Sequence, residues 1–366
     1  MQQVMYLDNA ATTQMKKNVV ESMLRYQTSY FGNASSLYTL GDLSSKAVGE
    51  ARGKIAGLLG VKDDEIVFTS GGTESNNTAL KGVLVSGDHL IVGKIEHDSI
   101  LKVAKQLEKD GVEVTYLDVD KEGKVDVGGV ESAIKENTKL VSVMHANNEV
   151  GTIQDISAIG KVCRAKGVLF HSDCVQSFCK VKIPIEDIDM ASFSAHKVHG
   201  PKGVGGLYVK KGIKVRPLLN GGGHEFGVRS GTENVPGIVG FGAAVQMIDS
   251  DKVRVMRDKI IDGVLKIDGS WLNGSKDRLC NNAHFGFKGV EGEALVLKLD
   301  EEGIMVSTGS ACSTKSLDPS HVLIAMGLNK VEAHGSLRVT LSEFNKEADV
   351  DRFLEVLPGI IEGLRK

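Results

Sequence analysis

Short apolar runs alternate with helical stretches between residues 66 and 193, and this alternation limits the folds open to the chain. The runs typical of strands cover residues 66–70, 89–92, 112–117, 139–144, 167–170 and 188–193. Successive strands joined by a helix pair in parallel, because the crossover helix returns the chain to the same end of the sheet. The sequence therefore predicts an α/β fold with a mostly parallel sheet and helices on both faces.

Polar and glycine-rich positions follow several of these strands. Gly71–Thr73, His97, Asn148, Asp173 and Lys197 each come just after a predicted strand end. Ligands bind parallel sheets at the carboxyl ends of the strands, so we expect these residues to converge on one site.

Lys197 and Asp173 have the chemistry of a pyridoxal-phosphate site. Lys197 lies in a turn between apolar runs, and burial disfavours the charged form of an amine and makes it reactive. Pyridoxal phosphate needs a lysine for the Schiff base and a carboxylate for the pyridine nitrogen. The alternative is a surface lysine and a solvated aspartate.

The segment Gly71-Gly72-Thr73 joins a predicted strand to a predicted helix. A glycine turn before a helix offers free backbone N–H groups to a phosphate. The segment matches neither a Walker A loop nor the dinucleotide fingerprint, and the alternative is a simple helix cap made by the threonine.

Two further residues are candidates for chemistry near the C-terminus. Cys312 lies in the small, polar segment 307–316, which we expect to be a mobile loop, so a reactive thiol competes with an incidental loop cysteine. Arg338 interrupts an apolar strand and needs a partner, which is either a substrate carboxylate or an internal salt bridge.

The length of 366 residues exceeds one ordinary domain. We expect a large domain over residues 14–250 and a small α/β domain formed by residues 1–13 and 251–366, which carries the cysteine loop. A single helix is predicted from about Val235 into the 260s.

Composition excludes several classes of protein. The net charge is −3, with 41% hydrophobic and 25% charged residues, which gives no strong attraction to nucleic acid or to membranes. The N-terminus lacks the features of a secretory signal. The five cysteines are odd in number and scattered, which indicates free thiols and a cytoplasmic location.

With these motifs in place, the chain resembles the cysteine desulfurases, which are fold type I pyridoxal-phosphate enzymes, over essentially its whole length. The resemblance rests on Thr-Ser-Gly-Gly-Thr-Glu-Ser at 69–75, Glu-His at 96–97, Asn-Asn-Glu-Val-Gly at 147–151, Ser-Ala-His-Lys-Val-His-Gly-Pro-Lys-Gly at 194–203, Arg-Ser-Gly-Thr at 229–232 and Gly-Ser-Ala-Cys at 309–312. The long loop around Cys312 is similar to that of the subgroup linked to iron–sulfur assembly. The resemblance implies a mostly parallel seven-stranded sheet.

The resemblance also implies roles for individual residues. Lys197 would carry pyridoxal 5′-phosphate and move protons, His97 would stack on the ring, and Cys312 would take the substrate sulfur as a persulfide. The other cofactor contacts implied are Asp173 at the pyridine nitrogen, Gln176 at the phenolic oxygen, Asn148, and Gly72, Thr73, Ser194 and His196 at the phosphate. Thr232 would reach the phosphate of the neighbouring subunit, and Arg338, Asn148 and Asn33 would orient the substrate.

The implied partners are L-cysteine, a second copy of the chain in a homodimer, and a sulfur acceptor such as an iron–sulfur scaffold protein. Alternatives are a selenocysteine lyase or aminotransferase of the same fold, and a scaffold protein whose site has decayed. Transamination needs no thiol in a loop, so Cys312 favours sulfur transfer.

The pattern His171-x2-Cys174-x4-Cys179 has a spacing that could suggest a metal site. Strand alternation points His171 and Cys174 to opposite faces, so we expect packing residues here and no metal.

Overall fold

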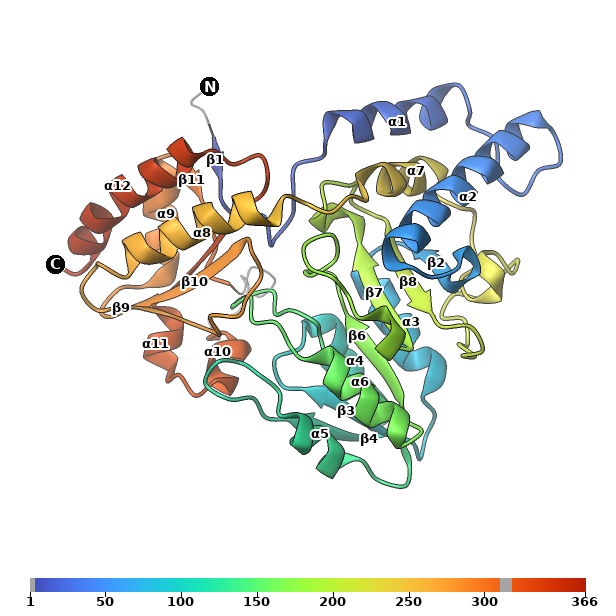
Figure 1. Cartoon of the computed structure of the whole chain (residues 1–366), viewed down its shortest axis with the longest axis horizontal. Coiled ribbons are helices and arrows are strands. Elements are labelled where there is room, and N and C mark those ends of the chain that lie inside the picture. Colours follow the sequence, from blue (N-terminus) through green and yellow to red (C-terminus); the bar gives the residue numbers. More distant parts are fainter. Residues whose placement is uncertain (1–3, 310–317) are drawn as a thin grey trace.

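The computed structural model describes residues 4–309 and 318–366. Its described part contains a seven-stranded sheet, a three-stranded sheet and a two-stranded pair (Figure 1). Cys312 lies outside the described residues.

The seven-stranded sheet has the strand order β2-β8-β7-β6-β5-β3-β4. Strand β8 runs antiparallel to both of its neighbours, and the other pairs are parallel, which confirms the mostly parallel sheet. In sheet order, the strands are β2 (Ile66–Thr69), β8 (Gly205–Val209), β7 (Met190–Ser194), β6 (Leu169–Asp173), β5 (Thr138–Ser142), β3 (His89–Gly93) and β4 (Glu113–Leu117).

Helices cover both faces of this sheet, because successive strand residues point to opposite sides. Leu90 and Val92 of β3 join the apolar cluster with α3 (Gly72–Val83) and α4 (Asp98–Lys109). Ile91 joins the cluster on the other face. The helices of that second cluster are α1 (Lys17–Thr28), α2 (Thr39–Leu59), α5 (Val127–Ala133), α6 (Ile156–Ala165) and α7 (Val235–Ala244).

A third apolar cluster contains residues of the C-terminal part of the chain and Leu7. Its antiparallel sheet has the order β12 (Ser336–Thr340), β10 (Asn282–Phe287), β9 (Ser270–Leu272). Strand β1 (Met5–Tyr6) pairs in parallel with β11 (Ile304–Met305), so the start of the chain lies beside this C-terminal part (Figure 1). The helices here are α8 (Ser250–Val264), α9 (Gly292–Glu301), α10 (His321–Ala325), α11 (Lys330–His334) and α12 (Glu347–Leu364). The domain boundaries given above stay a prediction.

The expected single helix after Val235 was wrong, because the chain forms two helices there. Helix α7 ends at Ala244, Val245 is extended, and Asp249 caps a new helix by accepting a hydrogen bond from the N–H of Lys252. An N-cap aspartate starts a helix by satisfying a free N–H group, so the break was readable at Asp249. Among the described helices, none has the length and apolar character needed to cross a bilayer.

Candidate active site

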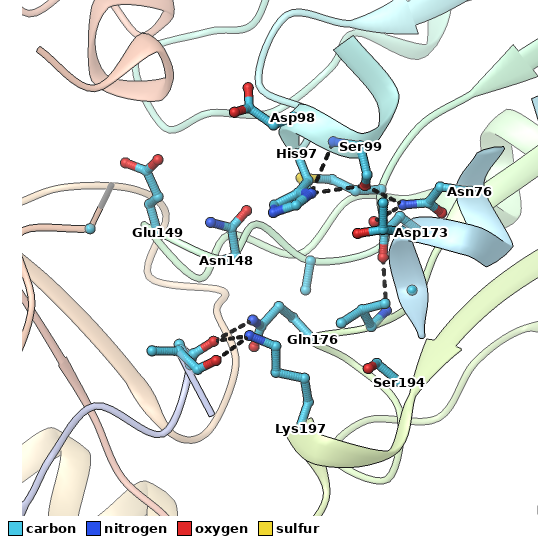
Figure 2. A pocket seen from close by; sticks show the side chains of 18 of the residues that line it. Asn76, His97, Asp98, Ser99, Asn148, Glu149, Asp173, Gln176, Ser194 and Lys197 are labelled. Carbon is cyan, nitrogen blue, oxygen red and sulfur yellow. Dashed lines mark hydrogen bonds between the residues drawn. The ribbon is translucent and has the colours of Figure 1, made fainter. Parts of the chain in front are cut away.

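A cavity of about 460 Å³ lies at the carboxyl ends of the parallel strands (Figure 2). Its wall brings together residues from segments far apart in the sequence, as the strand pattern predicts. The predicted site residues that line it are Gly72, Thr73, His97, Asn148, Asp173, Gln176, Ser194, His196, Lys197 and Arg338.

Two predicted site residues lie elsewhere on this chain. Asn33 is exposed, and its side chain accepts a hydrogen bond from the N–H of Ser35. Thr232 is also exposed and does not line the cavity.

Lys197 ends the short helix η3 (Ala195–Lys197), which follows β7 directly. Its amine donates to the carbonyl oxygens of Ala10 and Ala11 at 2.5 and 2.8 Å. Gln176 donates to the same Ala10 oxygen at 3.0 Å. The N-terminal turn thus closes one side of the cavity and meets the two side chains (Figure 2).

Asp173 ends β6 and is buried, with both carboxylate oxygens fixed in place. One oxygen accepts from the N–H of Val175 at 2.9 Å, and the other accepts from Nδ2 of Asn76 at 2.7 Å. Two donors on separate oxygens hold the carboxylate in one orientation, facing the cavity.

A hydrogen-bonded run joins Asp173 to His97 (Figure 2). Nδ2 of Asn76 also donates to Oγ of Ser99 at 2.8 Å, and that hydroxyl lies 2.8 Å from Nδ1 of His97. The Ser99 N–H donates to the same Nδ1 at 3.1 Å, so His97 caps α4. Because Nδ1 accepts, the proton of the neutral ring is on Nε2.

Sequence reasoning missed Asn76 and Ser99. The signal for Asn76 was its position four residues after Gly72, on the same face of α3. Ser99 stands two residues after His97, where a histidine N-cap finds its donor.

The start of α3 is shaped to hold an anion. Its N-cap is Gly71, without a side-chain hydrogen bond, so the alternative of a threonine cap was wrong. A Cβ on Gly72 would lie 2.6 Å from Cγ2 of Val175, so only glycine allows the helix to approach this closely. Free N–H groups at a helix N-terminus attract phosphate.

His196 borders the same end of the cavity as a neutral ring. Burial lowers its pKa to about 4, and the positive charges of Lys197, Lys202 and Lys180 act in the same direction. Its Nδ1 lies 3.1 Å from Oγ1 of Thr12.

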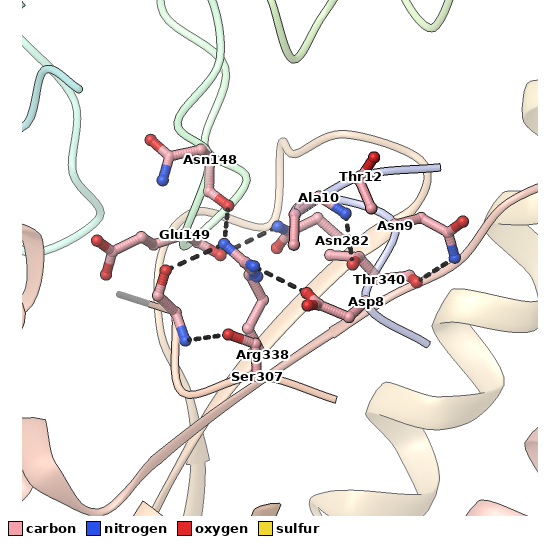
Figure 3. Close-up of polar contacts among 12 residues, drawn as sticks. Asp8, Asn9, Ala10, Thr12, Asn148, Glu149, Asn282, Ser307, Arg338 and Thr340 are labelled. Carbon is pink, nitrogen blue, oxygen red and sulfur yellow. Dashed lines mark hydrogen bonds and ion pairs between the residues drawn. The ribbon is translucent and has the colours of Figure 1, made fainter. Parts of the chain in front are cut away.

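Arg338, on β12, lies at the opposite wall with an exposed fraction of 2% (Figure 3). Its Nη1 donates to the carbonyl oxygens of Asn148 and Gly309 at 2.9 and 3.0 Å, and Nη2 forms a 2.8 Å ion pair with Asp8. Nε finds no hydrogen-bond partner among the described residues. The internal salt bridge is therefore present, and the guanidinium also faces the cavity.

Both flanks of residues 310–317 are tied to the loop that contains Asn148. Gly309 is held through Arg338, as described above. Beyond residue 317, the hydroxyl of Ser320 donates to Oε2 of Glu149 at 2.5 Å and also caps α10. These contacts fix Gly309 and Ser320, which lie on either side of residues 310–317 in the sequence.

His171 is used for internal hydrogen bonds. Its ring nitrogens lie 2.8 and 3.0 Å from the hydroxyls of Ser142 and Ser192, and burial lowers its pKa to about 3. Burial also raises the pKa of Cys174 to about 12 and of Cys179 to about 11, so both behave as packing residues.

The fold and this cavity define a class, and residues 5–353 match the model of the aminotransferase class-V family. The chain belongs to that family. It is 48% identical to cysteine desulfurase IscS 1 of Archaeoglobus fulgidus over 373 residues, which cover 98% of this chain and 97% of that protein. It is also 48% identical to cysteine desulfurase IscS of Clostridium botulinum strain Hall over 382 residues, which cover 100% and 96%.

Solved structures agree with these relatives. A structure described as a NifS-like protein superposes with a TM-score of 0.92 at 37% identity, covering 99% of this chain and all of the other. One described as SspA in complex with cysteine superposes with a TM-score of 0.84 at 38% identity, covering 93% of this chain and all of the other.

Proposed function

We propose that the chain is a pyridoxal-phosphate-dependent cysteine desulfurase that converts L-cysteine to L-alanine and leaves a persulfide on Cys312. The observation that carries this proposal is the convergence of the Lys197 amine, the Asp173 carboxylate and the Arg338 guanidinium on one cavity. Gly309, three residues before Cys312, lines that same cavity.

The residues present fit the cofactor. The start of α3, with Gly72 and Thr73, would hold its phosphate together with Ser194 and His196. Asp173 would pair with the pyridine nitrogen, Lys197 would form the covalent link, and Gln176 would face the phenolic oxygen. Bound pyridoxal phosphate supplies an electron sink that weakens the bonds at the substrate Cα.

The protein side chains would do the rest of the chemistry. Arg338 would hold the α-carboxylate of L-cysteine with its planar fork, sharing its charge with Asp8. The Lys197 amine would take the proton from Cα and later return protons to the carbon skeleton, which leaves as alanine.

The sulfur step would belong to Cys312. Its thiolate would attack the substrate Sγ, so that an S–S bond forms while the Cβ–S bond breaks and its electron pair stays on carbon. The sum is L-cysteine plus a thiol giving L-alanine plus a persulfide. An acceptor such as an iron–sulfur scaffold protein would then take the sulfur.

We also propose a cytoplasmic homodimer. Seven described large apolar side chains are exposed by 60% or more, and four of them are Phe31, Leu37, Tyr38 and Phe226. These four flank α2 and the glycine-rich segment before Thr232, so a second copy would cover them and receive Thr232 at its phosphate site. The reduced, buried thiols Cys163, Cys174, Cys179 and Cys280 suit a reducing compartment.

The test is incubation of the purified, cofactor-loaded protein with L-cysteine, followed by mass spectrometry. We expect alanine in solution and the added mass of one sulfur atom on the peptide with Cys312. The Cys312→Ser variant should keep the visible cofactor band and lose the sulfur adduct, and Lys197→Ala should lose both alanine and the normal band.

Other outcomes would point to the alternatives. 3-Mercaptopyruvate formed without sulfur on Cys312 would indicate an aminotransferase, and activity confined to selenocysteine would indicate a selenocysteine lyase. A protein that takes up no cofactor would refute the proposal and favour a scaffold.

A further inference from the structure

A second lysine lies directly behind the cavity wall. The side chain of Lys180 is buried, and its amine donates to the backbone carbonyl oxygens of Gln176 and Lys197 at 3.0 and 3.2 Å. In the part of the chain that the structure describes, Lys180 forms no ion pair with a carboxylate. In the described chain its hydrogen bonds go to neutral carbonyl groups. The ionisable groups near it include the thiols of Cys179 and Cys280 and the carboxylate of Glu343, which is paired with Lys16.

Such an ammonium is expensive to bury. Taking a charge from water costs several kcal/mol unless it is well paired, and burial accordingly lowers the pKa of Lys180. A neutral side chain of similar length would fill the same space without this cost. The positive charge of Lys180 therefore needs an explanation other than the filling of space.

The two carbonyls that Lys180 binds belong to two cavity residues with a shared target. The side chains of Gln176 and Lys197 both donate to the oxygen of Ala10, on the cavity side. Lys180 holds their backbones from the other side. Gln176 and Lys197 are therefore each held by two contacts, one from the Lys180 ammonium to the backbone and one from the side chain to the Ala10 carbonyl oxygen.

The turn that carries Lys180 is itself anchored. Cys179 has a positive φ of 61°, and its carbonyl oxygen accepts from the N–H of Ile248 at 3.0 Å. The carbonyl of Lys180 accepts from the hydroxyl of Ser250, at the start of α8. An ammonium on a turn fixed in this way cannot relax easily toward solvent.

The field of Lys180 reaches the site. Its positive charge contributes to the lowered pKa values of both His196 and His199, which flank Lys197 in the sequence. The charge of Lys180 reaches these two histidines because the protein interior screens it poorly.

We propose that Lys180 is a positioning residue that fixes the backbones of Gln176 and Lys197 and places a positive charge beside the Lys197 backbone. This inference rests on the proposed function, since it concerns the residues that would hold pyridoxal phosphate. The charge disfavours a second positive charge on the Lys197 nitrogen and so keeps that nitrogen able to accept a proton.

The test replaces Lys180 with methionine, which keeps the length of the side chain and removes the charge. The first readout is the pH at which the visible band of the bound cofactor titrates. With the cation gone, the protonated Lys197–cofactor link is favoured, so the midpoint should rise by about one pH unit. Cofactor affinity, measured by fluorescence titration of the cofactor-free protein, should fall about tenfold.

Lys182→Met is the matched control. Lys182 is exposed and stands two residues away, so it removes the same formal charge from the surface. Its midpoint and affinity should equal those of the wild type, because surface charges are screened.

The other ionisable groups at the cavity come from separate elements and are unchanged in both variants. They are Asp173 at the end of β6, His97 and Asp98 at the start of α4, Glu149 beside Asn148, His196 in η3, His321 in α10 and Arg338 on β12. Cys179, Cys280 and Glu343, which are ionisable groups near Lys180 itself, are also unchanged. A shift seen only with Lys180→Met is therefore assigned to Lys180.

Three results decide the matter. A loss of thermal stability in Lys180→Met with an unchanged midpoint would overturn the proposal and leave a structural role. If this variant does not fold, Lys180→Gln replaces it, because glutamine keeps a hydrogen-bond donor without the charge. An unchanged titration midpoint in Lys180→Gln would also refute the proposal. A wild-type protein that binds no cofactor would instead sink the proposed function.

Discussion

Asn76 is the residue through which the acid and the imidazole of the site are joined. Its amide donates one hydrogen bond to Asp173 and one to Ser99, which contacts His97. A side-chain amide has two N–H donors, and no hydroxyl or carboxylate could supply both bonds. The orientation of Asp173 and the tautomer of His97 therefore depend on the same group.

We predict that Asn76→Ala loses about tenfold or more in turnover number while still binding the cofactor. The reason is that Asp173 and Ser99 each lose a buried donor, which costs about 1–3 kcal/mol. Steady-state kinetics of alanine release gives the measurement. Asn77→Ala is the control, since the Asn77 amide donates only to the carbonyl oxygen of Thr73 and its turnover should be unchanged. Equal turnover in the two variants would contradict the role given to Asn76.

At this scale the sequence predicts which residues matter better than what they touch. Ten of the residues predicted from strand ends and motifs line one cavity, and Lys197 and Asp173 are among them. The pairing of Arg338 with Asp8 joins residues 330 positions apart, so no local pattern could have indicated it. The network through Asn76 and Ser99 depends on the packing of α3 against α4, which periodicity does not specify.

The N-cap of helix α10 contacts the loop beside the cavity, where the proposed chemistry takes place. Its N-cap, Ser320, satisfies the N–H of Leu323 and also donates to Glu149, on the loop beside the cavity. A cap usually serves only its own helix, whereas this one also fixes the chain directly after residues 310–317. The other short helix nearby, α11, is capped by Asn329 through a capping box with Glu332.

We predict that Ser320→Ala slows persulfide formation on Cys312 at least severalfold, with little change in cofactor affinity. The variant loses both the cap and the contact with Glu149, together worth roughly 1–2 kcal/mol. Rapid-quench mass spectrometry would follow the sulfur adduct. Asn329→Ala removes a comparable cap without touching Glu149, so it should lose similar stability yet form persulfide at the normal rate. A normal rate in Ser320→Ala would contradict the link.

Helices and strands were predicted correctly where the apolar pattern was long. They were misread where a helix cap sets the boundary between two helices. The strands of the large sheet appear in the sequence as short apolar runs, and the buried face of α2 follows the helical period. The join between α7 and α8 was missed because apolar residues recur on both sides of Asp249, which hides the helix cap between them. Antiparallel β8 follows from a tight Gly-Pro turn that leaves no room for a crossover helix.

For the molecule as a whole, two properties follow from what is buried and what is exposed. Three fully or almost fully buried histidines are neutral: burial lowers the pKa of His145 to about 4 and of His171 and His284 to about 3. The large apolar side chains around α2 are in contrast left in contact with solvent.

We predict that the protein loses stability as the pH falls from about 6.5 toward 4. In this window the unfolded state binds protons on these histidines and the folded state does not, so the free energy of unfolding drops with decreasing pH. Each histidine contributes roughly 1.4 kcal/mol per pH unit. Urea unfolding at a series of pH values measures the slope, which should be shallower in His171→Asn. An identical slope in that variant would show that His171 is not among the groups responsible.

We predict that Leu37→Lys converts a dimer to a monomer and lowers cofactor affinity. Leu37 is fully exposed on the isolated chain, and a buried lysine there would be unpaired in the interface. Analytical ultracentrifugation gives the mass of the assembly. Val331→Lys, at an equally apolar exposed position on α11, should leave the assembly intact. A wild-type protein that sediments as a monomer would refute the proposed dimer.

The acceptors of the Lys197 amine are residues 10 and 11, and Ala10 is itself held by the hydroxyl of Thr340 at 2.9 Å. A chain emerging from the ribosome can assemble the central sheet before Thr340 is synthesised, but the Ala10 N–H then lacks the hydroxyl that helps to fix this turn. The wall of the cavity that receives the Lys197 amine is therefore expected to reach its final geometry only when translation is nearly finished.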